Sequence, residues 1–86
     1  MPEISRFLGI VVAMLFADHA PAHFHVRYGG HDATLAIDAP ALLGGRLRPR
    51  VVGLVIEWAT LHREELLANW DRARALEPLL PIAPLE

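Results

Sequence analysis

The stretch HFHVRYGGHDATLAI, residues 23–37, decides the fold because apolar and polar residues alternate on both sides of a Gly-Gly pair. Alternate side chains leave opposite faces of a β-strand, so residues 23–28 have one apolar and one polar face. The apolar set is Phe24, Val26 and Tyr28, and the polar set is His23, His25 and Arg27. Gly29 and Gly30 favour a tight turn into a return strand over residues 33–37. The stretch therefore predicts an antiparallel hairpin.

The sequence leaves two registers of this hairpin open. A two-residue turn pairs Tyr28 with His31, whereas a four-residue loop over residues 29–32 shifts the pairing by two. A shift of two keeps every side chain on its face, and only an odd shift reverses the faces. In both registers the polar residues of the first strand point away from the apolar side of the sheet.

The apolar run FLGIVVAMLFA, residues 7–17, predicts a strand over residues 9–16 that is buried on both faces. The run is too short for a bilayer, which takes about 20 residues. Its flank MPEISR has one acid and one base, unlike the positive flank of a signal peptide. We expect residues 1–7 to be a short lead-in and residues 18–22 to form a turn around Pro21.

After the hairpin, Pro40 and the Gly44-Gly45 pair predict a loop over residues 38–47. A helix is expected from near Pro49, with a bend or a break near His62 where its apolar stripe drifts. Three prolines predict an extended arm over residues 77–86, lying on this molecule or on a neighbour. The order of elements predicts one α+β domain over residues 1–86, with an antiparallel sheet of three or more strands. One long or bent C-terminal helix packs on one face of this sheet, giving two layers.

The composition bounds the function classes. Hydrophobic residues make up 53% of the 86-residue chain and charged residues 21%, which is more apolar than usual for so small a domain. We therefore expect a homo-oligomer or a complex with a small protein partner. The net charge of −2 gives no overall attraction to nucleic acid or to membrane. The absence of cysteine excludes disulfides and cysteine zinc fingers, and it is compatible with a cytoplasmic protein.

Three stretches in order, MPEISRFLGI, DHAPAHFHVRY and EWATLHREELLANW, make the chain similar to a small bacterial family called domain of unknown function 4160. The family more often has Pro where this chain has Ala22, which leaves every histidine of the motif in place. The resemblance implies a compact α+β domain, often encoded beside other small proteins in a toxin–antitoxin-like arrangement. It implies no established activity and no assigned catalytic residue.

Three of the five histidines, His19, His23 and His25, lie within seven residues and form a candidate zinc or iron site. His23 and His25 leave the strand on one face, about 7 Å apart at the backbone, and His19 can approach them across the turn. No obvious carboxylate completes the local motif, so Glu57 or His62 of the helix is the expected support. The plain alternative is that the rings bond to the turn backbone.

The alternative hypothesis needs no metal. In it, His23 and His25 act as general acid and base in phosphodiester cleavage, and Arg27 stabilises the charge that develops on phosphorus. The competing interpretation of Arg27 is a cross-strand pair with Asp32. A second candidate site is a group of three arginines beside the helix start, for phosphate or for a partner. These arginines are Arg46, Arg48 and Arg50.

From these features we predict a protein-interaction module of an operon-encoded or toxin–antitoxin-like complex. The alternative function is a metal-binding or RNase-like protein that uses the histidine cluster. Glu57 is expected on the solvent face of the helix, and His62 next to Trp58.

Overall fold

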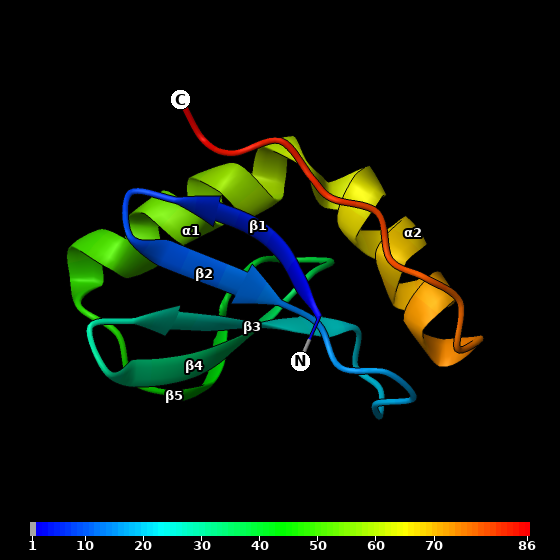
Figure 1. The fold of residues 1–86 in the computed structure, drawn as a ribbon. Helices are drawn as coiled ribbons and strands as arrows, with labels where there is room; N and C mark the ends of the chain where they lie inside the picture. The colour runs from blue at the N-terminus through cyan, green and yellow to red at the C-terminus, as the bar shows by residue number, and fades with distance from the viewer. Residues whose placement is uncertain (1) are drawn as a thin grey trace.

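The computed structural model describes residues 2–86 and contains five strands followed by two helices (Figure 1). The elements are β1 (Glu3–Phe7), β2 (Ile10–Ala13), β3 (His23–Tyr28), β4 (His31–Ala36), β5 (Leu42–Gly45), α1 (Pro49–Leu61) and α2 (Arg63–Arg74). The strands form one antiparallel sheet in the order β1-β2-β3-β4-β5. The predicted α+β class is confirmed.

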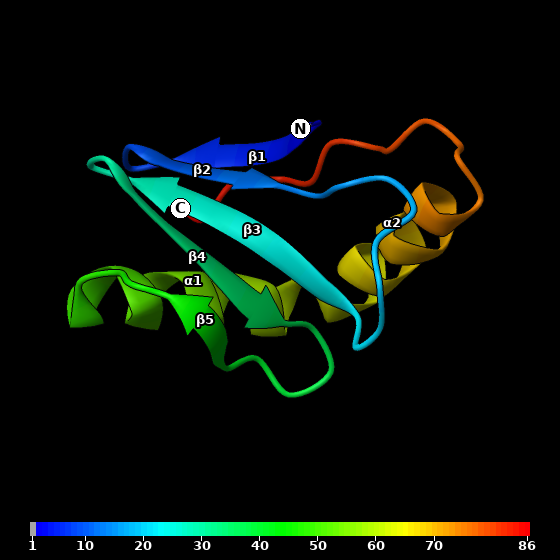
Figure 2. The ribbon, with the colours of Figure 1, turned by 90° about the horizontal axis from the view of Figure 1, so that it is seen from below.

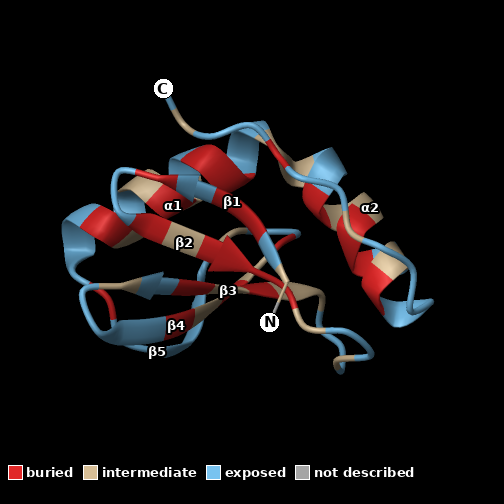
Figure 3. Cartoon of the chain, viewed as in Figure 1, coloured by how far each residue is buried: buried red, intermediate tan, exposed pale blue. Residues whose placement is uncertain are grey.

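Helix α1 covers one face of the sheet, and α2 lies beyond the end of the strands (Figures 1 and 2). Trp58 of α1 is fully buried between the two layers, with its ring centroid 5.5 Å from that of Phe7 and 6.0 Å from that of Phe24. Buried residues follow the inner sides of the strands and of α1 (Figure 3). None of the helices in residues 2–86 is long and apolar enough to cross a membrane.

The central hairpin has the register of the two-residue turn, because Tyr28 pairs with His31 and Phe24 with Leu35. Gly29 and Gly30 both have positive φ, at 55° and 80°, as a tight hairpin turn requires. Phe24 and Val26 are buried, whereas His23 and His25 are only partly buried. The predicted assignment of faces is confirmed.

The prediction for the N-terminal part was wrong. Residues 1–7 were expected to be a lead-in to one strand over residues 9–16, but Glu3–Phe7 and Ile10–Ala13 pair as two strands of a hairpin. Its turn consists of Leu8 and Gly9, both with positive φ. A positive φ is uncommon for leucine, so the sequence lacks the usual hairpin signal at this turn.

The prediction of a loop over residues 38–47 was also wrong in part, since Leu42–Gly45 forms the edge strand β5. Gly45 pairs with Ala33 at a positive φ of 81°. A Cβ added to Gly45 would collide with the backbone of Asp32 and Ala33. Gly45, one of the two glycines that indicated a loop, is therefore required by the close approach of two strands.

The helical region is interrupted at His62, which has φ −113° and ψ 25° between α1 and α2. This confirms the predicted break. The His62 ring lies 5.6 Å from that of Trp58, and its Nδ1 lies 2.6 Å from Glu65 Oε1. Glu57 is exposed on α1, as expected.

Residues 77–86 form neither helix nor strand and run back along α2 and β1 (Figure 1). Every third residue packs against the core: Leu79, Ile82 and Leu85. This period of three is that of a polyproline-type extended chain. The Ile82 N–H donates to the Ile4 carbonyl at 2.8 Å, and the Trp58 indole N–H donates to the Ala83 carbonyl at 2.9 Å. The C-terminal arm therefore lies on its own molecule.

The fully buried Asn69 of α2 also holds the arm. Its Nδ2 donates to the Leu80 carbonyl at 2.8 Å, and its Oδ1 accepts the Leu80 N–H at 3.0 Å. One side-chain amide thus satisfies both backbone groups of one arm residue.

Candidate metal centre

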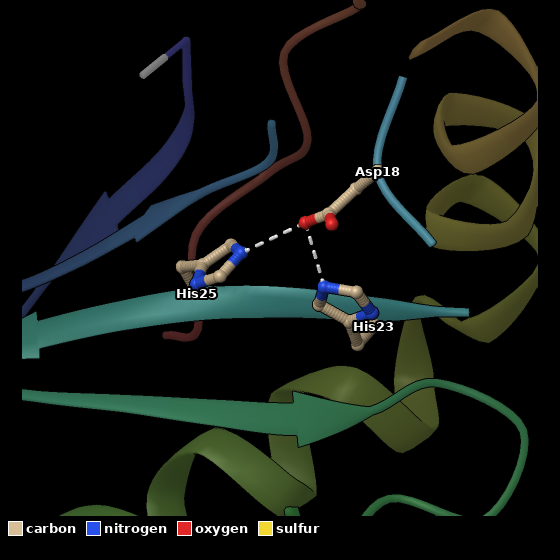
Figure 4. A group of neighbouring side chains, drawn as sticks. All are labelled: Asp18, His23 and His25. Atoms are coloured by element: carbon tan, nitrogen blue, oxygen red, sulfur yellow. Dashed lines mark hydrogen bonds and ion pairs between the residues drawn. The ribbon is translucent and has the colours of Figure 1, made fainter. Parts of the chain in front are cut away.

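Asp18 and two histidines converge at the end of β3 that lies nearest α2 (Figure 4). Asp18 comes from the connection between β2 and β3, and its Oδ2 lies 2.8 Å from His23 Nε2 and 3.4 Å from His25 Nε2. One ligand atom from each of the three residues lies within 4.8 Å of the others. Within residues 2–86 this is the one such group of three or more histidine, cysteine or acidic side chains.

The local sequence explains the convergence. His23 and His25 are two residues apart on β3, so both rings leave its polar face. The connection then brings Asp18 over them, with its Oδ1 accepting the His19 backbone N–H at 2.8 Å. The His23 ring is held between His25, at a centroid distance of 5.2 Å, and Trp70 of α2, at 5.1 Å. Strand, turn and helix each contribute to the position of the rings.

The hydrogen bonds around Asp18 favour its ionised form. Its pKa is lowered first by the hydrogen bond from the His19 backbone N–H and then by the hydrogen bonds to His23 and His25, while burial acts in the opposite direction. The carboxylate is therefore a negative charge at neutral pH. Its side chain is 20% exposed, against 11% for His23 and 23% for His25. The cluster is partly covered but reachable from solvent.

The two ring nitrogens of His23 both face oxygen atoms that can only accept hydrogen bonds. Nδ1 lies 2.7 Å from the Pro21 carbonyl oxygen, and Nε2 faces the ionised Asp18 carboxylate. A neutral imidazole has only one N–H to donate. The arrangement therefore requires either a second proton on His23 or a cation between Nε2 and Asp18.

His25 has a different surrounding. Its Nε2 faces Asp18, and its Nδ1 lies 3.4 Å from the hydroxyl oxygen of Thr34 on β4. A hydroxyl can donate as well as accept, so the tautomer of His25 with its proton on Nε2 is satisfied without a second proton or a metal ion: Nε2–H donates to Asp18 and the Thr34 hydroxyl donates to Nδ1. If Nε2 binds a metal, Nδ1–H can donate to Thr34, as that of His23 donates to Pro21. Such outer hydrogen bonds orient the histidine ligands of metal sites.

The structure assembles only part of the residue set expected from the sequence. His19 is exposed and lies outside the three-residue group, although its backbone N–H binds Asp18. The expectation that the motif lacks a carboxylate was wrong, because Asp18 provides one. Neither Glu57 nor His62 belongs to the group. The available signal for Asp18 was its place at the start of a turn that must reverse the chain onto the histidines.

Arg27 lies on the same face as the histidines but pairs with Asp32, its Nε donating to Oδ1 at 3.1 Å. The competing interpretation of this residue was therefore correct. Arg27 and Asp32 line a hollow of about 630 Å³ on the polar face of the sheet, together with His25 and Thr34. His25 thus belongs both to the cluster and to the wall of the hollow.

The three arginines of the second candidate site do not belong to the cluster of Asp18, His23 and His25 and lie in the segment from the end of β5 to the first turn of α1. Arg46, Arg48 and Arg50 are all exposed. The backbone N–H of Arg46 donates to the Asp32 carbonyl at 3.0 Å, which fixes the start of this segment beside β4.

Comparison with known families identifies a family that the chain matches over most of its length. The sequence model described as Domain of unknown function (DUF4160) matches residues 9–71, which include the whole cluster and both helical segments up to the last turn of α2. Neither the curated proteins nor the solved structures compared with the chain gave a match.

Proposed function

The chain belongs to the family named domain of unknown function 4160, and we propose that it binds one divalent transition-metal ion, zinc or iron(II). The observation that supports this function is the convergence of Asp18, His23 and His25 on one point. Two imidazoles and one carboxylate form a ligand set that suits non-haem iron(II) and catalytic zinc. The family name itself specifies no activity, so the proposal depends on this geometry.

The surroundings of His23 give a second reason. In the neutral form of His23 that donates to Pro21 from Nδ1, Nε2 and Asp18 Oδ2 are two acceptor atoms in close contact. A metal ion between them would bind both atoms and remove this unfavourable contact. His23 Nδ1 then remains the donor to the Pro21 carbonyl, a common arrangement for a metal-binding histidine. The competing arrangement is a doubly protonated His23 paired with Asp18, without any metal.

The two distances from the Asp18 carboxylate to the histidine nitrogens are close to those of a metal site, and the two histidine ligand atoms lie within 4.8 Å of each other. Zinc–nitrogen and zinc–oxygen distances near 2.0–2.1 Å in a tetrahedron place neighbouring ligand atoms about 3.4 Å apart. The distance from Asp18 Oδ2 to His25 Nε2 already has this value, at 3.4 Å. The distance to His23 Nε2 is 2.8 Å and would widen by about 0.6 Å, which a small rotation of the carboxylate provides.

The same site leaves room for further ligands. Three protein ligands leave at least one coordination position for water or for a substrate, the pattern of catalytic rather than structural zinc. The hollow next to His25 gives such a position access from the polar face of the sheet. A metal-bound water in an open site is a nucleophile near neutral pH, so a hydrolytic reaction is compatible with the arrangement.

The test measures metal binding to untagged protein, because a histidine tag would bind zinc itself. Chelator-treated wild type is titrated with Zn²⁺ and, without oxygen, with Fe²⁺ by calorimetry, and the stoichiometry is measured by mass spectrometry of the metal. We expect one ion per chain, with at least about 100-fold weaker binding in His23→Ala and in His25→Ala. His31→Ala is the matched control, since His31 is an exposed histidine of the same hairpin outside the cluster.

Binding also has a readout in stability. Saturating metal should raise the melting temperature of wild type and of His31→Ala but not of His23→Ala, because a ligand of the native state stabilises it. Equal zinc affinity in wild type and His23→Ala contradicts the proposal. If wild type binds no metal but cleaves RNA, and His25→Ala does not, acid–base chemistry by the histidines replaces it.

A second function, association with another protein chain, is favoured by a different observation. Leu42 and Leu43 of the edge strand β5 are 44% and 51% exposed, and no charged side chain interrupts this strand. Exposed apolar edges are sites where strands of other chains pair. We expect sedimentation of wild type at micromolar concentration to give a mass above the 9.5 kDa of one chain, and Leu43→Asp to reduce it. A monomer mass with no co-purifying partner contradicts this role.

A further inference from the structure

We infer that β5 and the adjoining start of α1 bind an acidic, extended segment of a partner protein. The inference is based on the proposed role in association and specifies the chemistry of the partner. The surface is defined by Leu42 and Leu43 of β5 and by the three arginines that follow, and is called the β5 corner below. The five residues are Leu42, Leu43, Arg46, Arg48 and Arg50.

The first argument is the distribution of unpaired positive charge. The chain has eight arginines and no lysine. Four of them bond to other groups through their side chains within residues 2–86: Arg6, Arg27, Arg63 and Arg72. Of the four whose guanidinium groups make no hydrogen bond or ion pair in that part of the chain, three lie in residues 46–50. Unpaired positive charge is therefore concentrated at the β5 corner, although the whole chain has a net charge of −2.

The helix adds to this potential. Arg50 lies in the first turn of the 13-residue helix α1, which has no acidic residue there and no side-chain cap. The helix dipole places partial positive charge at this end, and acidic side chains usually compensate it. His31 lies nearby, since it lines a small hollow of about 310 Å³ with Arg46 and Arg48. A negatively charged partner would supply the missing compensation.

The second argument is the state of the two edges of the sheet. At the β1 edge, the arm covers the strand and the Ile82 N–H bonds to the Ile4 carbonyl. At the other edge, β5 pairs only with β4, and all four of its residues are exposed. Leu42 and Leu43 offer apolar contacts there, so an extended segment can add to this edge.

These observations favour a protein over a nucleic acid as the occupant. Residues 38–50 contain no aromatic side chain on which a base could stack, and stacking is a main source of single-strand affinity. The exposed leucines have no use in binding phosphates, but they offer apolar contacts to a protein segment. An acidic segment with apolar residues at every second position matches both features of the β5 corner.

The experiment uses a fluorescein-labelled ten-residue peptide of alternating valine and glutamate, titrated with wild-type protein and followed by fluorescence anisotropy. We expect micromolar affinity that weakens with salt. The triple variant Arg46→Gln, Arg48→Gln, Arg50→Gln should lose at least about tenfold, and Leu43→Ser about threefold. Arg74→Gln is the matched control, because Arg74 is an exposed arginine without a side-chain partner in residues 2–86 and lies outside the surface. It should bind like wild type.

Three results overturn the inference. They are no peptide binding at about 1 mM protein, equal binding by the triple variant with its unfolding midpoint unchanged, and tighter binding of poly-uridylate than of the peptide. Sedimentation separates this failure from failure of the association itself. If the wild type forms an oligomer that Leu43→Asp dissociates, but does not bind the peptide, then the proposed association stands. Only the inference of an acidic partner is then wrong.

Discussion

The connection between β2 and β3 and the C-terminal arm are both irregular segments held by a polar side chain, but their hydrogen bonds differ in kind. Asn69 presents a donor to the Leu80 carbonyl and an acceptor to the Leu80 N–H. At the β2–β3 connection, the Pro21 carbonyl and the Asp18 carboxylate both present acceptors to one His23 ring. The Asn69 amide and the backbone of Leu80 are fully matched, whereas His23 lacks one positive partner.

This difference separates structural from functional use of polar groups. A buried group whose partners are complementary stabilises the fold and needs nothing further. A group surrounded by acceptors can bind a proton or a metal ion, and whether it does so depends on the pH and on the metal available. The comparison predicts that changes in the arm alter stability and that changes in the cluster alter binding.

The largest stability effect is expected in the arm. Ile82 is 5% exposed, and Ile82→Ala should lower the free energy of unfolding by about 3 kcal/mol through lost burial and a cavity. Leu80→Ala is the matched control, since Leu80 is 54% exposed and should change little. Urea unfolding measures both variants. Equal losses in Ile82→Ala and Leu80→Ala would mean that the arm does not pack as a three-residue repeat. They would contradict the prediction that changes in the arm alter stability through its buried residues.

A smaller loss is expected from Asn69→Ala, about 2 kcal/mol, because the N–H and the carbonyl of Leu80 lose their hydrogen bonds to the buried Asn69 side chain. Hydrogen exchange should show faster exchange at the Leu80 amide, whereas the zinc affinity of the cluster should stay unchanged. A variant that loses metal binding and stability together would show that the two regions are not separate.

The sequence predicts the centre of the fold better than its edges. Residues 23–37 have strict alternation and a Gly-Gly turn, so both the hairpin and its faces follow from local rules. The β1–β2 turn at Leu8 and Gly9 and the edge strand ending at Gly45 break those rules. Each depends on pairing with a neighbouring strand, which no local pattern contains.

The candidate site was predicted in part for the same reason. Alternation places His23 and His25 on one face, but which turn residue approaches them depends on the path of the chain from residue 14 to residue 22. His19 has the more obvious ligand chemistry, and the structure turns it outward while Asp18 points inward. Asp18 also has the usual role of a turn-forming residue through its bond to the His19 N–H, and that role concealed the second one.

The smallest stability effect is expected from Asp18→Asn. This change gives the cluster a side-chain amide with one donor and one acceptor, like the amide of Asn69 that binds the arm. The amide nitrogen of the new side chain can donate to His23 Nε2, so the metal-free protein at pH 7 should stay within about 1 kcal/mol of wild type. The variant should nevertheless lose zinc binding, because a neutral amide is a weak ligand.

Acidic pH should increase the difference in unfolding free energy between wild type and Asp18→Asn. The pKa of Asp18 is lowered in the folded state, so its ionised form contributes stability that is present above the ordinary aspartate pKa of about 3.9. This contribution disappears as the pH falls through the lower folded-state value. Wild type should therefore lose more unfolding free energy than Asp18→Asn between about pH 5 and pH 3, as measured by urea titrations with chelator present. If the unfolding free energies of the two proteins have parallel pH profiles, the hydrogen bonds of the Asp18 carboxylate do not stabilise its ionised form. The electrostatic argument for the difference between the cluster and the Asn69–Leu80 contact would then be wrong.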